Sequence, residues 1–287
     1  MPETRRLPQC WGHRGASVSF PENTIASFEA AIRDGVDGIE SDVHVSKDNV
    51  VLITTDFTGV IKDCNPDGMK HARTKKEPKQ SIPTFSETVA LLMKMENRHI
   101  HLIVDVKAQN DPQQLFSLVH TIIASHPQWQ NTLAPRILLA GKGTPPLLPS
   151  AISINLWIAK TYLWNDVECV SVWYNALMGW EGQRFRDDVR RSGKKLMVFT
   201  VNEPHHLMEM VQWDVDGIVT DNPNRWLELK SALEANYDTT TARYSRLFLY
   251  TTPTFYWPFT YEIQKLAKYV LERWGGPLDE PVLLAVE

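Results

Sequence analysis

The sequence predicts an α/β protein whose main domain is a (β/α)8 TIM barrel, followed by a separate C-terminal tail. The chain has 287 residues, and short β-rich runs alternate with helical patterns over roughly residues 8–233. Alternation of this kind indicates parallel strands joined by helical crossovers. Eight such units occupy about 250 residues in a barrel of this type. A doubly wound open sheet is the alternative fold, but no GxGxxG turn follows the first strand.

The expected elements follow one another in chain order. Asn23 or Thr24 can cap the first helix, and Gly35 follows its end, where a left-handed residue is favoured. The expected strands are Cys10–Gly15, Gly38–Val45, Val50–Thr54, His101–Lys107, Arg136–Ala140, Ala151–Leu156, Cys169–Trp173, Lys195–Val201 and Gly217–Thr220. The expected helices are Thr24–Asp34, Phe85–Glu96, Pro112–Ser125, Glu181–Ser192 and His205–Trp213.

Two segments interrupt this alternation. Gly141–Ser150 contains two glycines and three prolines. A crossover between parallel strands normally needs a dozen or more residues that include a helix, so we expect the barrel to be imperfect around 141–150. Residues 234–245 are polar and aperiodic, which predicts a linker between the barrel domain of residues 8–233 and the tail of residues 246–287.

The composition is that of an ordinary soluble globular protein, with 43% hydrophobic and 22% charged residues and a net charge of −4. Nothing in this charge indicates a nucleic-acid partner. Cys10, Cys64 and Cys169 are scattered and form neither a disulfide framework nor a zinc spacing. We see no apolar signal-peptide core and no window long enough to span a membrane. We therefore expect an intracellular protein, and the sequence leaves its oligomeric state open.

Acidic residues at the end of the second expected strand are the first functional signal. Glu40 and Asp42 are two residues apart, so both side chains lie on one face of the strand. At the C-terminal end of a barrel strand that face opens onto the catalytic mouth. Two converging carboxylates repel each other unless a proton or a cation lies between them, and a hard divalent cation prefers such oxygen ligands. The alternative is a polar strand end with solvated acids.

A later strand repeats this pattern. It is apolar and ends in Asp105 and Lys107, which are again two residues apart. This arrangement suits a third metal ligand beside an ammonium group that binds phosphate, although a local ion pair explains this strand taken alone. The two segments together favour a site for Mg²⁺ or Ca²⁺ rather than zinc.

The first expected strand adds a histidine and an arginine. His13 titrates near neutral pH and can transfer a proton, while Arg14 offers a planar fork to a phosphate group. Gly12 and Gly15 flank this pair, and glycines allow a ligand to approach the backbone closely.

These motifs resemble the glycerophosphodiester phosphodiesterase family over about residues 8–230. The valine-rich strand before Lys107 and the hydrophobic tail are most similar to the fungal phosphatidylglycerol phospholipase C branch. The matching segments are Trp11–Ala16, Pro21–Thr24, Phe28, Ala31, Gly35–Val43, Lys47–Asp48, Ser81–Phe85, Asp105–Lys107, Phe199–Asn202 and Asp216–Pro223.

This resemblance implies a (β/α)8 barrel and metal-dependent hydrolysis of glycerophosphodiesters or phosphatidylglycerol-like phospholipids. A metal polarises the phosphoryl oxygen, and a proton must reach the leaving alkoxide. The implied roles are Glu40, Asp42 and Asp105 as ligands of one Mg²⁺ or Ca²⁺ ion, His13 as acid/base, and Arg14 and Lys107 as phosphate-binding residues.

One position departs from the family pattern. The family has a second histidine in a His-Asp pair, and this chain has Thr55 there, followed by Asp56. Threonine cannot act as a general acid near pH 7, and loss of one positioned acid/base typically costs ~10²–10⁴-fold in rate. A catalytically impaired, ligand-binding barrel is therefore an alternative function. A related phospholipase D-like lyase is disfavoured, because it also needs both histidines.

Two segments, near 57–68 and at 141–150, are short for the family. This indicates either divergence of the chain or a coding sequence that was joined incorrectly. The loop Met69–Lys79 carries five basic residues against Glu77. Near a barrel mouth such a loop attracts anionic lipid head groups, and the alternative is a solvated loop.

The tail combines aromatic and amphipathic patterns. Seven aromatic residues lie between Phe248 and Tyr261, and an apolar stripe at helical spacing runs from Ile263 to Trp274. We expect either an interfacial membrane anchor or a helix packed on the outer wall of the barrel. Pro253 and Pro258 interrupt the aromatic cluster, so it cannot cross a bilayer as one helix.

Overall fold

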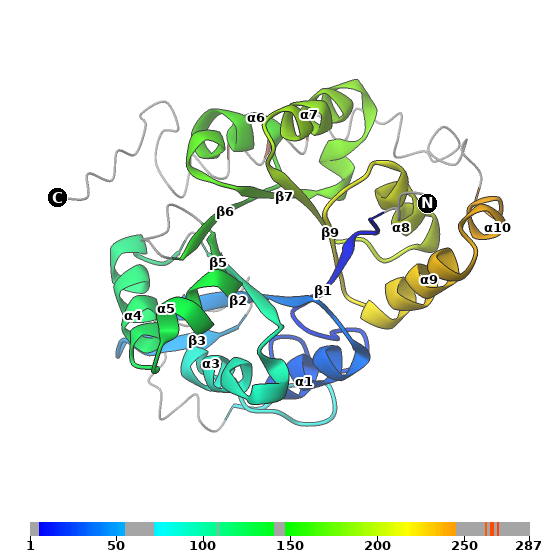
Figure 1. Cartoon of the computed structure of the whole chain (residues 1–287). Helices are drawn as coiled ribbons and strands as arrows, with labels where there is room; N and C mark the ends of the chain where they lie inside the picture. The colour runs from blue at the N-terminus through cyan, green and yellow to red at the C-terminus, as the bar shows by residue number, and fades with distance from the viewer. Residues whose placement is uncertain are drawn as a thin grey trace.

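A closed ring of strands forms the centre of the computed structural model, and the helices surround it (Figure 1). The structure describes residues 6–54, 72–107, 109–140 and 147–244, together with Glu262, Lys265, Leu266 and Tyr269. The strands are β1 (Gln9–His13), β2 (Gly38–Val45), β3 (Val51–Ile53), β4 (His101–Val106), β5 (Ile137–Ala140), β6 (Leu148–Ser153), β7 (Cys169–Trp173), β8 (Lys195–Phe199) and β9 (Gly217–Thr220).

Strand pairing closes this ring. The order of neighbours is β1-β9-β8-β7-β6-β5-β4-β2, and β1 also pairs with β2. Every pair in the ring is parallel, while β3 is antiparallel to β2 and extends it as a hairpin. The predicted (β/α)8 barrel is confirmed. The open-sheet alternative is wrong, because an open sheet has two unpaired edges.

The helices lie on the outside of the ring and cover the strands (Figure 1). They are α1 (Ile25–Asp34), α3 (Phe85–Met93), α4 (Pro112–Ala124), α5 (Trp129–Thr132), α6 (Leu156–Ile158), α7 (Gly179–Arg191), α8 (Pro204–Gln212), α9 (Pro223–Ala235) and α10 (Tyr237–Thr241). Short 3-10 turns cover Met95–Asn97, Ala134–Arg136, Trp164–Asp166 and Tyr174–Leu177, and a π-helical turn covers Ala159–Leu163.

Local capping explains where the early helices begin and end. Thr24 caps α1, because its side chain accepts a hydrogen bond from the backbone N–H of Ser27. Gly35 ends the same helix with a φ of 100°, the left-handed conformation that favours glycine. Thr84 and Glu87 form a reciprocal capping box at the start of α3. The predicted roles of Thr24 and Gly35 are confirmed.

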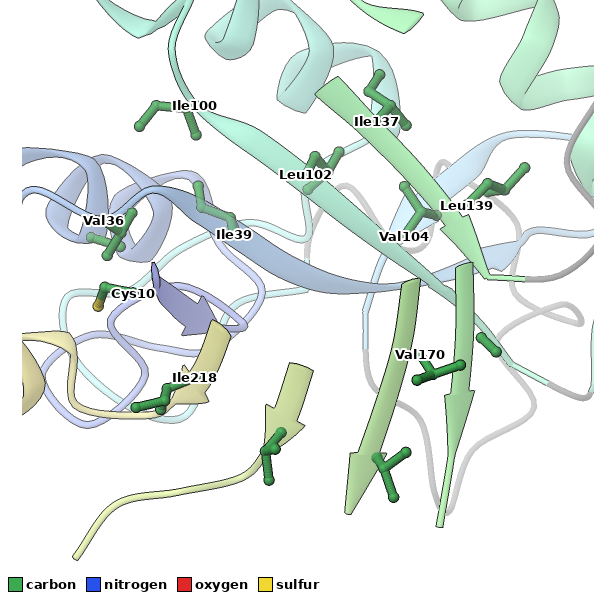
Figure 2. Close-up of a cluster of buried hydrophobic side chains, with 14 of the residues drawn as sticks. Cys10, Val36, Ile39, Ile100, Leu102, Val104, Ile137, Leu139, Val170 and Ile218 are labelled. Carbon is green, nitrogen blue, oxygen red and sulfur yellow. The ribbon is translucent and has the colours of Figure 1, made fainter. Parts of the chain in front are cut away.

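Successive strand residues alternate between the outer layer and the barrel interior. Cys10 and Leu102 face the helices and belong to the main core, part of which Figure 2 shows. Trp11 and Ile103, the next residue on each strand, belong to a separate interior cluster with Leu138, Cys169, Met197 and Val219. The two-residue repeat of a strand produces this division, and it determines which polar side chains point into the barrel.

Two regions differ in detail from the prediction. β6 is Leu148–Ser153 rather than Ala151–Leu156, and its pairing with β5 closes the ring at the segment that was expected to be imperfect. Residues 234–245 were predicted as a linker, but they contain the end of α9 and the short helix α10. Thr240 is buried there and donates a hydrogen bond to the carbonyl of Ala232, so α10 packs back onto α9.

Among the described residues, no helix has the length and apolar character needed to cross a membrane. Most of the tail of residues 246–287, where the anchor was predicted, lies outside the described residues. The domain boundaries at 233 and 245 therefore stay predictions.

Candidate active site

Three neighbouring strands bring the predicted acidic residues and His13 together. Glu40 lies opposite His13 in the register between β2 and β1, and Asp42 lies opposite Asp105 in the register between β2 and β4. His13 and Asp105 lie two residues after the interior residues Trp11 and Ile103, and Glu40 pairs with Ile103 itself, so all four side chains point into the barrel. His13 ends β1 and Asp105 lies one residue before the end of β4, so the group lies toward the C-terminal side of the barrel, where active sites of such barrels are found.

The three carboxylates form one cluster. Glu40, Asp42 and Asp105 each offer an oxygen atom, and these atoms all lie within 4.8 Å of one another. Glu40 and Asp42 are buried, while Asp105 is partly exposed. The sequence prediction that two strands supply converging acids therefore agrees with the geometry, and the role of these acids as metal ligands stays a proposal.

Glu40 shows why this cluster needs a positive charge. Within the described part of the chain, Oε2 of Glu40 has no hydrogen-bond partner, and the nearest cationic group is Nε2 of His13 at 3.7 Å. Burial raises the pKa of Glu40 to about 7, against the opposing effect of His13. A buried carboxylate of this kind is costly to ionise unless a cation compensates it. The oxygen donors and their spacing therefore fit a hard divalent cation.

Asp42 is the most enclosed member of the cluster. Its Oδ2 pairs with Nε of Arg14 at 2.9 Å and accepts a hydrogen bond from Nδ2 of Asn23 at 2.8 Å. Its Oδ1 pairs with Nζ of Lys107. The same ammonium group lies 2.5 Å from Oδ2 of Asp105, so Lys107 bridges the two aspartates. Burial lowers the pKa of Lys107, but the two aspartates outweigh it and raise that pKa above its ordinary value.

Arg14 reaches the site from a left-handed backbone conformation with a φ of 57°. Besides Asp42 it pairs with Glu22, whose Oε1 lies 3.1 Å from Nη1. Both predicted phosphate-binding residues, Arg14 and Lys107, thus lie at the carboxylate cluster, and each is paired with acids there.

Contacts within the chain explain why glycine occupies positions 12 and 15, whereas the prediction was close approach of a ligand. Gly15 has a φ of 85°, and a Cβ atom there would lie 2.0 Å from Oγ of Ser27 on α1. A Cβ on Gly12 would lie 2.8 Å from the carbonyl oxygen of Gly15. These glycines allow close contact of the chain with itself, not only with a ligand.

His13 is oriented by Asp221, which lies near the C-terminal end of the barrel domain in the sequence. Nδ1 of His13 lies 2.6 Å from Oδ1 of Asp221, which follows β9. Asp221 is fixed in turn by Nδ2 of Asn202 at 2.6 Å and by Oγ of Ser17 at 3.0 Å. Burial lowers the pKa of His13, but the hydrogen bond to Asp221 and the charge of Glu40 outweigh it and raise the pKa above 6.5.

The sequence prediction missed three residues that support the site. Asp221 and Asn202 lie in two of the matching segments, but those segments gave no indication that they contact His13. Asn23 was considered as a helix cap. It is instead buried with a φ of 55°, and its side chain holds Asp42 and Ser41 in place. Thr55 and Asp56 lie outside the described residues.

The sequence of this chain is similar to those of known phosphodiesterases. The model of the glycerophosphoryl diester phosphodiesterase family matches two overlapping segments, residues 13–109 and 60–225. A glycerophosphodiester phosphodiesterase of Bacillus altitudinis is 24% identical over 251 residues, covering 79% of this chain and 100% of the relative.

Solved structures have the same fold. A putative glycerophosphoryl diester phosphodiesterase of Silicibacter pomeroyi superposes with a TM-score of 0.68 at 18% identity, covering 79% of this chain and 94% of the other. An Oleispira antarctica phosphodiesterase in complex with the product sn-glycerol-3-phosphate superposes with a TM-score of 0.62 at 18% identity, covering 77% and 96%.

Proposed function

Because this chain belongs to the glycerophosphoryl diester phosphodiesterase family, we propose that it is a metal-dependent hydrolase of glycerophosphodiesters or phosphatidylglycerol-like phospholipids. The observation that carries this proposal is the cluster of Glu40, Asp42 and Asp105 beside His13 at the mouth of the barrel. The resemblance to the phosphatidylglycerol phospholipase C branch supports a lipid substrate that is cleaved on the diacylglycerol side of phosphorus.

In this proposal Glu40, Asp42 and Asp105 hold one Mg²⁺ or Ca²⁺ ion. When bound, the cation polarises a phosphoryl oxygen and stabilises negative charge on it. The buried position of Glu40 and Asp42 strengthens this effect, because charges interact more strongly where water is excluded. Arg14 and Lys107 lie beside the same carboxylates and orient the phosphodiester group by its charge.

His13 moves the proton. Its Nδ1 is held by Asp221, so Nε2 is the nitrogen that faces the cluster and exchanges a proton with the substrate. A protonated Nε2 donates to the alkoxide oxygen that leaves phosphorus. A glycerol head group carries a hydroxyl next to the phosphate. This hydroxyl attacks phosphorus as the bond to the leaving alkoxide breaks, its proton passes to water, and a cyclic phosphodiester forms. Water then opens the ring and completes the hydrolysis.

Turnover by the purified full-length protein tests this proposal. We expect release of glycerol phosphate from a water-soluble glycerophosphodiester and from phosphatidylglycerol vesicles, with Mg²⁺ or Ca²⁺ required. Glu40→Gln should weaken metal binding measured by calorimetry. His13→Ala should remove turnover and leave metal binding intact, because His13 is not a ligand of the cluster. Full turnover in His13→Ala contradicts its assigned role.

The second candidate function is a binding barrel that does not turn substrate over. Thr55 favours it, because it stands where the family has its second histidine. Thr55→His should raise the rate by up to ~10²–10⁴-fold if the rest of the site is intact. If Thr55→His changes nothing while the metal and a diester still bind, the binding barrel is the better description.

A further inference from the structure

The exposed apolar side chains of the barrel gather on its catalytic face. Val18 follows β1, Ile154 and Trp157 follow β6, and Trp180 follows β7. The C-terminal ends of parallel strands face one side of a barrel, so these four residues lie on the same face as the carboxylate cluster. Trp180 is 64% exposed and Val18 is 54% exposed. Met95, which precedes β4, is the remaining large apolar residue exposed among the described barrel residues.

These apolar residues border the mouth on two opposite sides. β1 and β6 are separated by β9, β8 and β7 in one direction and by β2, β4 and β5 in the other. Figure 1 shows β1 and β6 across the ring from each other. Val18 therefore lies on one side of the mouth, and Ile154, Trp157 and Trp180 lie on the other. Apolar groups are therefore available to a docking surface on both sides of the mouth.

Basic residues lie next to the apolar residue on the β1 side. The described part of the basic loop, residues 72–80, exposes Arg73, Lys75, Lys76 and Lys79 against a single acid, Glu77. Nζ of Lys76 donates hydrogen bonds to the carbonyls of Ser17 and Val18 at 2.8 and 2.5 Å.

These hydrogen bonds hold the basic loop against the loop that follows β1, beside the exposed Val18. The ends of the basic loop are also joined, because Thr74 and Gln80 exchange two hydrogen bonds. The positive charge is therefore fixed at the mouth, not spread over a detached loop.

The opposite side of the mouth pairs an aromatic residue with a cation. The guanidinium of Arg184 lies 4.8 Å from the centre of the Trp180 ring, one helical turn along α7. Tryptophan is enriched at the depth of lipid head groups, because its ring is apolar and its indole N–H is polar. Arginine beside it adds attraction to anionic lipids.

We propose that this rim, formed by Val18, Ile154, Trp157, Trp180 and the loop of residues 72–80, docks the barrel mouth onto an anionic lipid bilayer. The inference rests on the proposed function, since a phosphodiester at head-group depth reaches the carboxylate cluster only if the mouth faces the bilayer. Charge favours this occupant, because the chain has a net charge of −4 while the loop at its mouth is basic. Apolar insertion and basic contacts are the two contributions on which interfacial binding depends.

Sedimentation of the full-length protein with lipid vesicles tests the proposal. We expect binding to phosphatidylcholine vesicles containing phosphatidylglycerol, weaker binding at high salt, and much weaker binding to pure phosphatidylcholine. A basic residue near an anionic surface contributes roughly five-fold in affinity, so replacing Arg73, Lys75 and Lys79 by glutamine should weaken binding roughly 10²-fold. Trp157→Ala with Trp180→Ala should also weaken it.

A matched control makes the same change in net charge at the other end of the barrel. Arg190 and Arg191 end α7, and Lys195 begins β8, so replacing these three by glutamine leaves the mouth unchanged. The proposal is overturned if this control and the basic-loop variant lose equal affinity, or if wild-type protein binds no vesicles. The latter result favours an acidic protein as the partner of the rim.

Hydrolysis of a water-soluble glycerophosphodiester separates this inference from the proposed function. The rim variants should keep wild-type rates on that substrate, because their side chains lie outside the carboxylate cluster. A protein that hydrolyses the soluble diester without binding vesicles contradicts docking alone. A protein that binds anionic vesicles through the rim without any turnover contradicts the proposed function alone.

Discussion

Asp221 fixes the imidazole of His13 in the orientation that the proposed proton transfer needs. The contact between Oδ1 and Nδ1 is 2.6 Å long, and it leaves Nε2 directed at Glu40. An oriented general acid contributes ~10²–10⁴-fold to a rate. The carboxylate also favours the imidazolium form of His13. In the proposed reaction Asp221 is therefore a positioning residue that acts through His13.

We expect Asp221→Asn to lower turnover by roughly 10²-fold or more while metal affinity stays close to wild type. The amide keeps the size of the side chain but removes its charge. Steady-state kinetics and calorimetry measure the two quantities separately. Ser17→Ala is the control, because Ser17 donates to the same oxygen at 3.0 Å without touching His13. Loss of metal binding in Asp221→Asn would show that the residue supports the whole site.

His101, which begins β4 at the end opposite to Asp105, makes the stability of the protein depend on pH. Burial lowers the pKa of its imidazole below 6.5, Arg136 and Lys195 add to this effect, and the backbone of Asp37 opposes it. As the pH falls below 6.5 the unfolded chain takes up a proton that the folded chain resists. The free energy of unfolding therefore decreases toward acidic pH.

His101→Gln should reduce this acid-induced loss of stability. Urea unfolding at pH 7.5 and pH 5.5 measures it, and the wild type should lose more stability between the two than the variant. His99→Gln, at an exposed histidine two residues earlier, is the matched control. Equal pH dependence in the two variants would contradict the prediction.

The carboxylate cluster was predictable because the two-residue repeat of a strand places Glu40 with Asp42 on one face. The direct pairing of β4 with β2 then brings Asp105 opposite Asp42. The partners of His13 were not predictable, since Asn202 and Asp221 lie in the segments that follow β8 and β9, late in the chain. Their contacts depend on how β1 and β9 close the ring. Asn23 was misread because a polar residue before a helix is ordinarily a cap.

At the scale of elements, most strands were predicted more accurately than the segments that connect them. β2, β7 and β9 have the predicted bounds. β6 was placed three residues too late, because the glycines and prolines of Gly141–Ser150 indicated a connection between strands and not a strand. The helix α9 was not predicted, although its buried residues Trp226, Leu229 and Leu233 recur at helical spacing.

Gly182 lies so close to the preceding turn that a larger side chain does not fit, and helical spacing in the sequence does not predict this contact. A Cβ atom at this position of α7 would lie 2.0 Å from the carbonyl oxygen of Leu177. Gly182→Ala should lower the free energy of unfolding by about 1–3 kcal/mol through overpacking. This exceeds the gain of about 1 kcal/mol that alanine gives in a helix interior.

Urea unfolding measures the effect of Gly182→Ala. Gln183→Ala is the control, because Gln183 is exposed in the same helix. If Gly182→Ala is as stable as this control, α7 does not depend on close contact with the turn of Tyr174–Leu177.

At the scale of the whole molecule, the rim and the tail are two separate proposed contributions to membrane binding. A single weak apolar or electrostatic signal gives marginal, reversible binding, whereas two signals together give stable anchoring. The rim supplies basic and apolar groups around the mouth. The tail, whose aromatic cluster and stripe from Ile263 to Trp274 predict an interfacial anchor, is the source of a second apolar signal.

Truncation after Ser245 should therefore leave a folded barrel that sediments much less with anionic vesicles. The described core of the barrel ends before this position, since α10 closes at Thr241. The rim should remain the only contact, so the residual binding should depend more steeply on salt than that of the full-length protein. Vesicle sedimentation at several salt concentrations measures both effects. Aggregation of the truncated protein, or unchanged vesicle binding, would mean that the tail packs on the barrel wall instead, because removal of an anchor leaves the barrel soluble.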